Sequence, residues 1–119
     1  AGTEGIRAWA ANPGHIATDL SAGQHDENFY RMMGGREKFE KHVRNLQQGA
    51  STQVWAAVSE HFEQGIGPRY LEDVGEMGMK PAGAAILDPG HGEHAFDREA
   101  EERLWRLSCQ VIGIEDDDS

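Results

Sequence analysis

The sequence predicts an α/β fold in which two short parallel strands are joined by helices. An apolar run at 6–11, interrupted only by Arg7 and bounded by turn residues, favours a strand buried on both faces. Residues 69–74 are predicted to form a second short strand after a turn rich in glycine and proline at 65–68. Two helical segments separate these strands, and a crossover of this kind implies parallel pairing.

The first strand is predicted to end at a proline-glycine corner. Pro13 lacks an N–H and pushes Asn12 into an extended conformation, so the strand cannot continue. Gly14 allows a sharp bend and lets a ligand approach the backbone closely, because it has no Cβ. Thr18 and Asp19 are predicted to cap a helix that follows. Ligands of open α/β sheets bind just beyond the carboxyl ends of strands, where this corner lies.

The segment after the corner alternates between loops and helices. Residues 21–28 are polar and read as a loop. The apolar cluster that follows stops at Gly34-Gly35 and is predicted to form a short helix or lid; its members are Phe29, Tyr30, Met32 and Met33. Next comes an amphipathic helix at 36–48, which Gly49 interrupts; its apolar positions are Phe39, Val43 and Leu46.

A second crossover helix is predicted at 50–62, with its buried stripe at Ala50, Val54, Ala57, Val58 and His61. After the second strand, 75–92 is rich in glycine and reads as a loop. Asp97, or Asp88 further back, is predicted to begin the last helix. The buried stripe of that helix is predicted at Ala100, Leu104, Leu107 and Val111.

Length and charge restrict what the chain can be. Its 119 residues suit one domain or part of one, which we place at 1–114, with an acidic, solvated tail at 115–119. The 21 acidic residues against 11 basic ones, a net charge of -10, disfavour nucleic acid and anionic membranes as partners. No apolar run approaches the ~18 residues of a membrane span. Cys109 is the only cysteine, which is compatible with a cytoplasmic setting.

Several segments resemble classical short-chain dehydrogenases/reductases, in the order in which that family carries them. The stretch Gly5-Ile6-Arg7 followed by Asn12-Pro13-Gly14-His15-Ile16-Ala17-Thr18 resembles the sixth strand of the family and its Pro-Gly turn. The run at 49–57 resembles the last major helix, and 69–74 resembles the seventh strand. The segment at 104–108 resembles the C-terminal helix of the retinol-dehydrogenase-like and protochlorophyllide-reductase-like branches.

The resemblance implies the C-terminal part of a Rossmann-type, doubly wound parallel sheet, incomplete alone. It implies NAD or NADP as cofactor of the complete enzyme, hydride transfer to or from a small carbonyl or alcohol substrate, and a homo-oligomer. The nicotinamide would be lined by Pro13, Gly14, Ile16 and Thr18. An apolar substrate would face Phe29, Tyr30 and Met33. Nothing in the sequence selects NAD over NADP or identifies the substrate.

The machinery that the family uses for phosphate binding and proton transfer is missing from the sequence. The glycine-rich phosphate turn is absent, since Gly34-Gly35 and Gly65-x-Gly67 lack its strand–turn–helix context. The family's catalytic tyrosine and lysine lie four positions apart, but here Tyr30 is followed at that spacing by Gly34, and Tyr70 by Val74. We therefore assign no catalytic residue, and expect a fragment that is inactive alone.

A non-catalytic interaction or metal-binding module is the alternative. The loop 88–94 carries His91 and His94 beside acidic residues, and zinc accepts imidazole and carboxylate ligands. The glycines of this loop leave such ligands without a fixed geometry, which favours a polar surface loop and no metal site. His15 on the corner is expected to face either the cofactor cleft or solvent, and Cys109 is expected to be a packing residue.

Overall fold

The computed structural model describes residues 7–21, 23–63 and 67–115, which form a mixed α/β fold. The α-helices and strands run in the order β1 (Ala10–Asn12), β2 (His15–Ile16), α1 (Glu27–Met32), α2 (Arg36–His42), β3 (Val43–Arg44), α3 (Leu46–Val58), β4 (Tyr70–Glu72), β5 (Gly75–Glu76) and α4 (Arg98–Ile112). Single 3₁₀ turns lie at Asp19–Ser21, Glu60–Phe62 and Glu93–Phe96.

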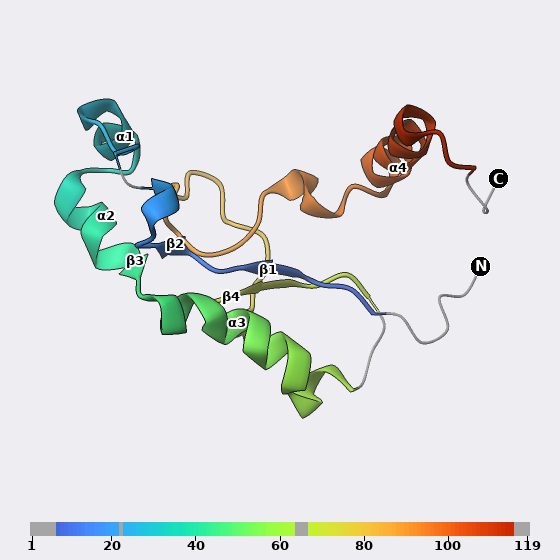
Figure 1. Ribbon diagram of the computed structural model, residues 1–119, viewed down its shortest axis with the longest axis horizontal. Helices are drawn as coiled ribbons and strands as arrows, with labels where there is room; N and C mark the ends of the chain where they lie inside the picture. Colours follow the sequence, from blue (N-terminus) through green and yellow to red (C-terminus); the bar gives the residue numbers. More distant parts are fainter. Residues whose placement is uncertain (1–6, 22, 64–66, 116–119) are drawn as a thin grey trace.

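The predicted parallel pairing of the two main strands is confirmed. β1 pairs with β4 in parallel, with Ala10 opposite Tyr70 and Asn12 opposite Glu72. Leu71, between them on β4, is completely buried at 0% exposure. Helix α3 lies along one side of this pair, and the segment that follows β5 lies on the other (Figure 1). The arrangement is compatible with part of a Rossmann-type sheet.

The first strand is shorter and later than predicted. The sequence favoured 6–11, whereas β1 begins at Ala10; residue 6 lies outside the described part of the chain. A strand extends only as far as its partner allows. The partner strand begins at Tyr70, two residues after Pro68, which has no N–H to donate. The backbone bond that opens the pairing is from Ala10 N to Arg69 O at 3.0 Å. Pro13 ends β1 as predicted.

The segment directly after the corner is a second strand, which corrects the predicted helix. β2 pairs in parallel with β3, so that His15 lies opposite Val43. Thr18 and Asp19 begin only a single 3₁₀ turn, at Asp19–Ser21. A strand forms here because β3 offers it a ladder of backbone groups; this partner is distant in sequence and leaves no local signal.

The helix predicted at 36–48 is wrong, because Asn45 divides it. Helix α2 ends at His42. The Asn45 side chain accepts a hydrogen bond from Gln48 N at 2.8 Å, and the Gln48 side chain accepts one from Asn45 N at 3.0 Å. This capping box requires an extended backbone at Asn45 and therefore starts a new helix, α3.

Gly49 lies within α3 and does not interrupt it, contrary to the prediction. A Cβ at this position would lie 2.1 Å from Cδ1 of Ile16. The missing side chain therefore lets α3 pack closely against β2. The stripe predicted for this helix is also wrong, because Val54 and Val58 are exposed, whereas Gly49 and Thr52 are the buried positions.

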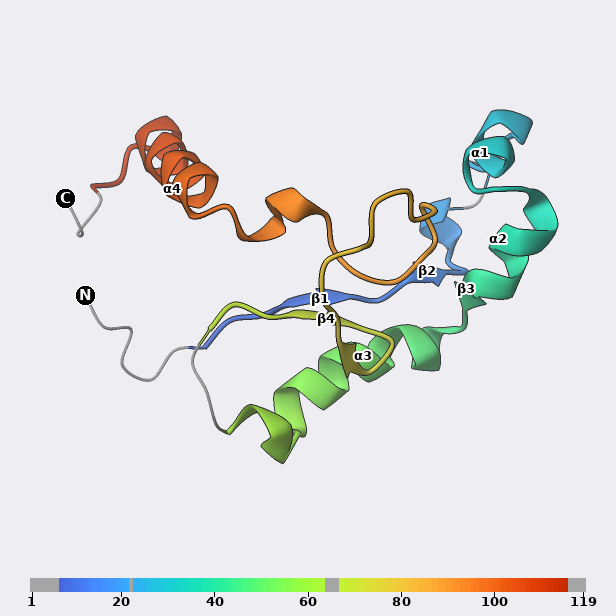
Figure 2. The ribbon, with the colours of Figure 1, turned by 180° about the vertical axis from the view of Figure 1, so that it is seen from behind.

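The N-terminal cap of the last helix is confirmed, and its buried stripe is not. Asp97 accepts a hydrogen bond from Ala100 N at 3.0 Å and begins α4. Leu104, Leu107 and Val111 are each more than half exposed. Both views show why, since α4 lies apart from the sheet (Figures 1 and 2). Within the described residues, no helix combines the length and the apolar character needed to cross a bilayer.

The apolar cluster after the corner forms a short helix, as predicted. Asp26 caps α1 by accepting a hydrogen bond from Phe29 N at 2.8 Å. The helix ends before Gly34 and Gly35, both of which have a positive φ. Of the predicted cluster, Met33 is buried whereas Met32 is exposed.

Candidate functional site

The proline-glycine corner forms as predicted at the carboxyl end of β1. Gly14 has a φ of +78°, which most side chains disfavour. Asn12 stabilises the bend, because its Oδ1 accepts a hydrogen bond from Gly14 N at 2.9 Å. The corner is thus held by a side chain two residues before it, as well as by Pro13.

Asn12 also connects the corner to the neighbouring strand. Its Nδ2 donates to the Tyr70 hydroxyl at 2.9 Å and to Glu72 Oε1 at 3.3 Å. Burial is the main cause that raises the pKa of Tyr70; the nearby Glu72 charge acts in the same direction, and the Asn12 hydrogen bond acts against it. One amide therefore fixes the corner relative to β4.

The corner faces a pocket of about 400 Å³ on the side of β2, which we call the apolar pocket. Three of the four residues predicted to line a nicotinamide line it, namely Gly14, Ile16 and Thr18; Pro13 is not among its lining residues. Its other walls are His15, Leu20, Ser21, Gln24, His25, Phe39 and Val43. Within the described residues, Thr18 makes its hydrogen bonds through its carbonyl, which accepts from Ser21 N and Oγ. No described residue makes a side-chain hydrogen bond to the Thr18 hydroxyl.

The residues predicted to face a substrate lie one layer behind this pocket. Phe29 stacks on His25 with ring centroids 4.3 Å apart, and contacts Phe39 edge-on at 5.0 Å. Tyr30 packs against Phe39 at 5.8 Å, and Met33 is buried. Phe29 and Tyr30 therefore support His25 and Phe39, which line the pocket themselves.

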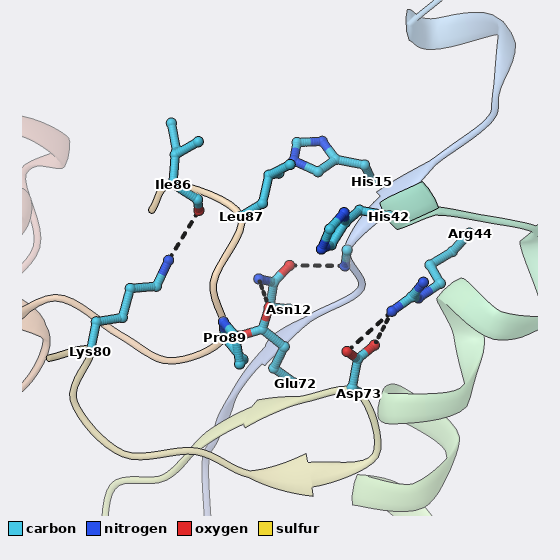
Figure 3. A pocket seen from close by; sticks show the side chains of 11 residues that line it. Asn12, His15, His42, Arg44, Glu72, Asp73, Lys80, Ile86, Leu87 and Pro89 are labelled. Carbon is cyan, nitrogen blue, oxygen red and sulfur yellow. Dashed lines mark hydrogen bonds and ion pairs between the residues drawn. The ribbon is translucent and has the colours of Figure 1, made fainter. Parts of the chain in front are cut away.

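A second pocket, of about 360 Å³, lies beyond the ends of β1 and β4; we call it the polar pocket (Figure 3). Gly14 and His15 line both pockets, so the corner separates them. The remaining walls of the polar pocket are Asn12, His42, Arg44, Glu72, Asp73, Lys80, Ile86, Leu87 and Pro89.

Sequence reasoning missed the charged residues of the polar pocket. Nη2 of Arg44 donates to both carboxylate oxygens of Asp73, each at 3.2 Å (Figure 3). Asp73 follows β4 directly, and the parallel pairing of β1 and β4 places it at the same edge of the sheet as the corner. That signal was available in the sequence. Arg44 had no such signal, because its segment was predicted to be helical.

His15 lies between the two pockets. Its ring contacts Phe39 edge-on at 5.1 Å. Burial lowers the pKa of His15 below its usual value, and the neighbouring His25 and His42 lower it further. The imidazole is therefore biased towards its neutral form, in which one ring nitrogen donates and the other accepts a hydrogen bond.

The described residues offer no donor set for the alternative metal site. No group of three histidine, cysteine, aspartate or glutamate side chains converges in this part of the chain. The His91 ring packs edge-on against Tyr70 and Phe96, with centroid distances of 5.8 and 4.8 Å. Its Nδ1 lies 2.9 Å from the Gly92 carbonyl oxygen. His91 thus contributes packing to this loop.

Known proteins that are similar to the chain are oxidoreductases. The short-chain dehydrogenase/reductase prx1 of Penicillium roqueforti is 36% identical over 113 residues, which cover 95% of this chain and 32% of the relative. Oxidoreductase calI of Penicillium decumbens is 33% identical over 121 residues, covering 96% and 34%. Retinol dehydrogenase 12 of Mus musculus is 25% identical over 111 residues, covering 93% and 29%.

The chain spans about a third of the length of these curated relatives. No family model matches it, and neither does any solved structure. The similarity is consistent with the C-terminal segment of a dehydrogenase of this kind.

Proposed function

We propose that this chain, a homologue of the short-chain dehydrogenases/reductases over nearly its whole length, supplies the nicotinamide-facing wall of an NAD(P)-dependent oxidoreductase. The whole enzyme would transfer hydride between the nicotinamide and a carbonyl or alcohol carbon of a small substrate. The observation that carries the proposal is that Gly14, Ile16 and Thr18 line one pocket just beyond the end of β1.

The chemistry of the apolar pocket fits a nicotinamide, a flat ring that carries one amide. Ile16 and Val43 offer apolar surface to the ring, and the Thr18 hydroxyl can donate to or accept from the amide. Gly14 lets the ring approach the backbone, since it has no Cβ. Leu20 lines the same pocket and is exposed, so that a bound ring would cover part of its side chain. When bound, the nicotinamide supplies or accepts the hydride.

In this proposal the substrate lies beside the nicotinamide, on the side supported by the aromatic cluster. Phe29 and Tyr30 hold His25 and Phe39 in the pocket wall. Their role is to keep an apolar surface next to the reacting carbon. Proton transfer needs other residues, because neither tyrosine of the chain has a lysine four positions on. We therefore expect the 119-residue chain to bind nicotinamide without catalysing the reaction.

The binding step can be tested by titrating the full chain with oxidised nicotinamide mononucleotide and monitoring the backbone amide signals by NMR. We expect saturable shifts at Gly14, Ile16 and Thr18, with weak affinity because the adenine half of the cofactor is missing. Thr18→Val should weaken binding severalfold. Ser108→Ala is the control, since this α4 hydroxyl donates within its own helix, to Leu104 O at 2.8 Å. Shifts that fail to saturate, or that avoid the corner, would contradict the proposal.

Hydride transfer can be tested in a chimera in which this chain replaces the matching 113 residues of the Penicillium roqueforti relative. We expect the chimera to keep nicotinamide-dependent activity. Thr18→Val in the chimera should raise the KM for the cofactor more than it lowers kcat. A folded chimera that neither binds the cofactor nor turns over would refute the assignment.

A further inference from the structure

We propose that the polar pocket binds the carboxylate of a small organic acid, with Lys80 as its principal cation and an apolar rim for the rest of the molecule. Carboxylate binding follows from the charges and contacts of this pocket alone. Its identification as part of the substrate site rests on the proposed function, because Gly14 and His15 are shared with the apolar pocket.

The two acidic side chains of the polar pocket are already satisfied by donors. Glu72 accepts from Asn12 Nδ2 through Oε1, and from Gly90 N through Oε2 at 2.9 Å. Asp73 accepts from Arg44 through both oxygens. Hydrogen bonds of this kind offset part of the negative charge that these carboxylates present to a ligand.

Lys80 differs, because its ammonium has only a neutral partner. Its Nζ donates to the carbonyl oxygen of Ile86 at 3.1 Å (Figure 3). Within the part of the chain that the structure describes, Lys80 takes part in no ion pair. An ammonium has three donors, so two remain for a ligand. Among the described residues, the ammonium of Lys80 therefore has no acidic ion-pair partner, in a chain whose net charge is -10.

The backbone holds Lys80 in place. Lys80 N donates to His91 O at 2.9 Å, and His91 N donates to Gly78 O at 3.1 Å. These two bonds form the bridge between Met79 and His91 and tie the segment that carries Lys80 to the segment that carries His91. Because the stem of Lys80 starts from this fixed point, less conformational freedom is lost when its ammonium binds an anion.

The remaining walls select among anions. Ile86, Leu87 and Pro89 give an apolar rim that suits a short hydrocarbon chain next to the charged group. Glu72 and Asp73 would repel a phosphate dianion more strongly than a carboxylate monoanion. The pocket therefore favours a carboxylate with an apolar substituent over an inorganic phosphate.

In the test, the 119-residue chain is titrated separately with butyrate, acetate and inorganic phosphate at constant ionic strength. Binding is monitored through the NMR signals of the backbone amides of Lys80 and Leu87. We expect saturable shifts with butyrate, weaker binding of acetate because it lacks the hydrocarbon chain, and the weakest binding of phosphate. Lys80→Gln should weaken butyrate binding at least fivefold, and Lys80→Arg should retain most of it. Thermal melting of each variant checks that it is folded.

Lys41→Gln is the matched control, because Lys41 is an exposed lysine of α2 paired with Glu37 at 2.7 Å. It should leave butyrate binding unchanged. Equal weakening by both glutamine variants would show nonspecific attraction and overturn the proposal. Phosphate binding as tight as butyrate binding would overturn the carboxylate assignment. Neither result depends on whether nicotinamide mononucleotide binds at the apolar pocket, so the two proposals can fail separately.

Discussion

At the scale of single residues, Gly49 decides how closely α3 approaches the strand after the corner. An alanine normally stabilises a helix interior by about 1 kcal/mol relative to glycine. Here the added methyl would lie 2.1 Å from Ile16 Cδ1. We expect Gly49→Ala to lower the free energy of unfolding by about 1–3 kcal/mol, the range for overpacking, as measured by urea denaturation.

The control for Gly49→Ala removes the Ile16 side-chain atoms that the new methyl group would contact. In the double variant with Ile16→Ala, the methyl has room, so the two substitutions should cost less together than the sum of their separate effects. Strict additivity, or a Gly49→Ala variant that is more stable than the parent chain, would show that the approach of α3 to β2 is not limited by this contact.

Val74 occupies a backbone conformation that suits glycine. Asp73 and Val74 are the two central residues of the β4–β5 turn, and their φ angles are 49° and 57°. A β-branched side chain is strained there, and turns of this type prefer glycine at the second position. We expect Val74→Gly to raise the free energy of unfolding by about 0.5–1 kcal/mol, and to raise the melting temperature.

Val54→Gly makes the same substitution at an exposed valine with helical backbone, within α3. It should destabilise the chain by about 1 kcal/mol. If both glycine variants lose stability to a similar extent, the conformation of Val74 carries no strain that glycine relieves.

At the scale of elements, α3 holds the β4–β5 turn through one hydroxyl. Thr52 is 2% exposed, and its Oγ1 accepts a hydrogen bond from Val74 N at 3.1 Å. Thr52→Val keeps the shape of the side chain but leaves Val74 N without this acceptor. We expect a loss of about 1–3 kcal/mol in unfolding free energy, measured by urea denaturation.

Thr52→Ser separates the hydroxyl from the methyl group. It keeps the acceptor and should recover most of the stability that Thr52→Val loses. The amide of Val74 should also exchange with deuterium faster in Thr52→Val than in Thr52→Ser. Equal stability of the two variants would show that packing, and not the hydrogen bond, holds the turn to α3.

The sequence could predict those elements whose ends are determined by residues within or next to the element itself. Pro13 and Gly14 act on their own backbone, and Asp97 caps its own helix, so the corner and the start of α4 were predictable. The helix boundary at Asn45 also has a local cause, the capping box with Gln48, which the apolar spacing of the segment concealed. The exposed stripe of α4 was not predictable, because periodicity reports an apolar face and not what covers it.

At the scale of the whole molecule, the candidate site combines residues from four separate segments. The parallel order of β1 and β4 could be predicted, since a helical crossover almost requires it. The polar pocket could not, because Arg44 reaches Asp73 only through the pairing of β3 with β2. The loop with Lys80 is placed by its bridge to His91. Such long-range pairings leave no periodic signal in the chain.

The stability of the whole chain should also depend on pH through His15. Burial, foremost, and then His25 and His42 lower its pKa in the folded state from the usual 6.5. Below about pH 6.5 the unfolded chain therefore binds a proton that the folded chain resists. This contribution to stability is present above the usual value and is lost as the pH falls through the lowered pKa. Urea denaturation at constant ionic strength should show a falling unfolding free energy from pH 7 to about pH 5.5.

His15→Gln should flatten that fall in unfolding free energy. His94→Gln, on the exposed turn before α4, should leave the fall in place. A fall that is equally steep in both variants would mean that His15 is not its source.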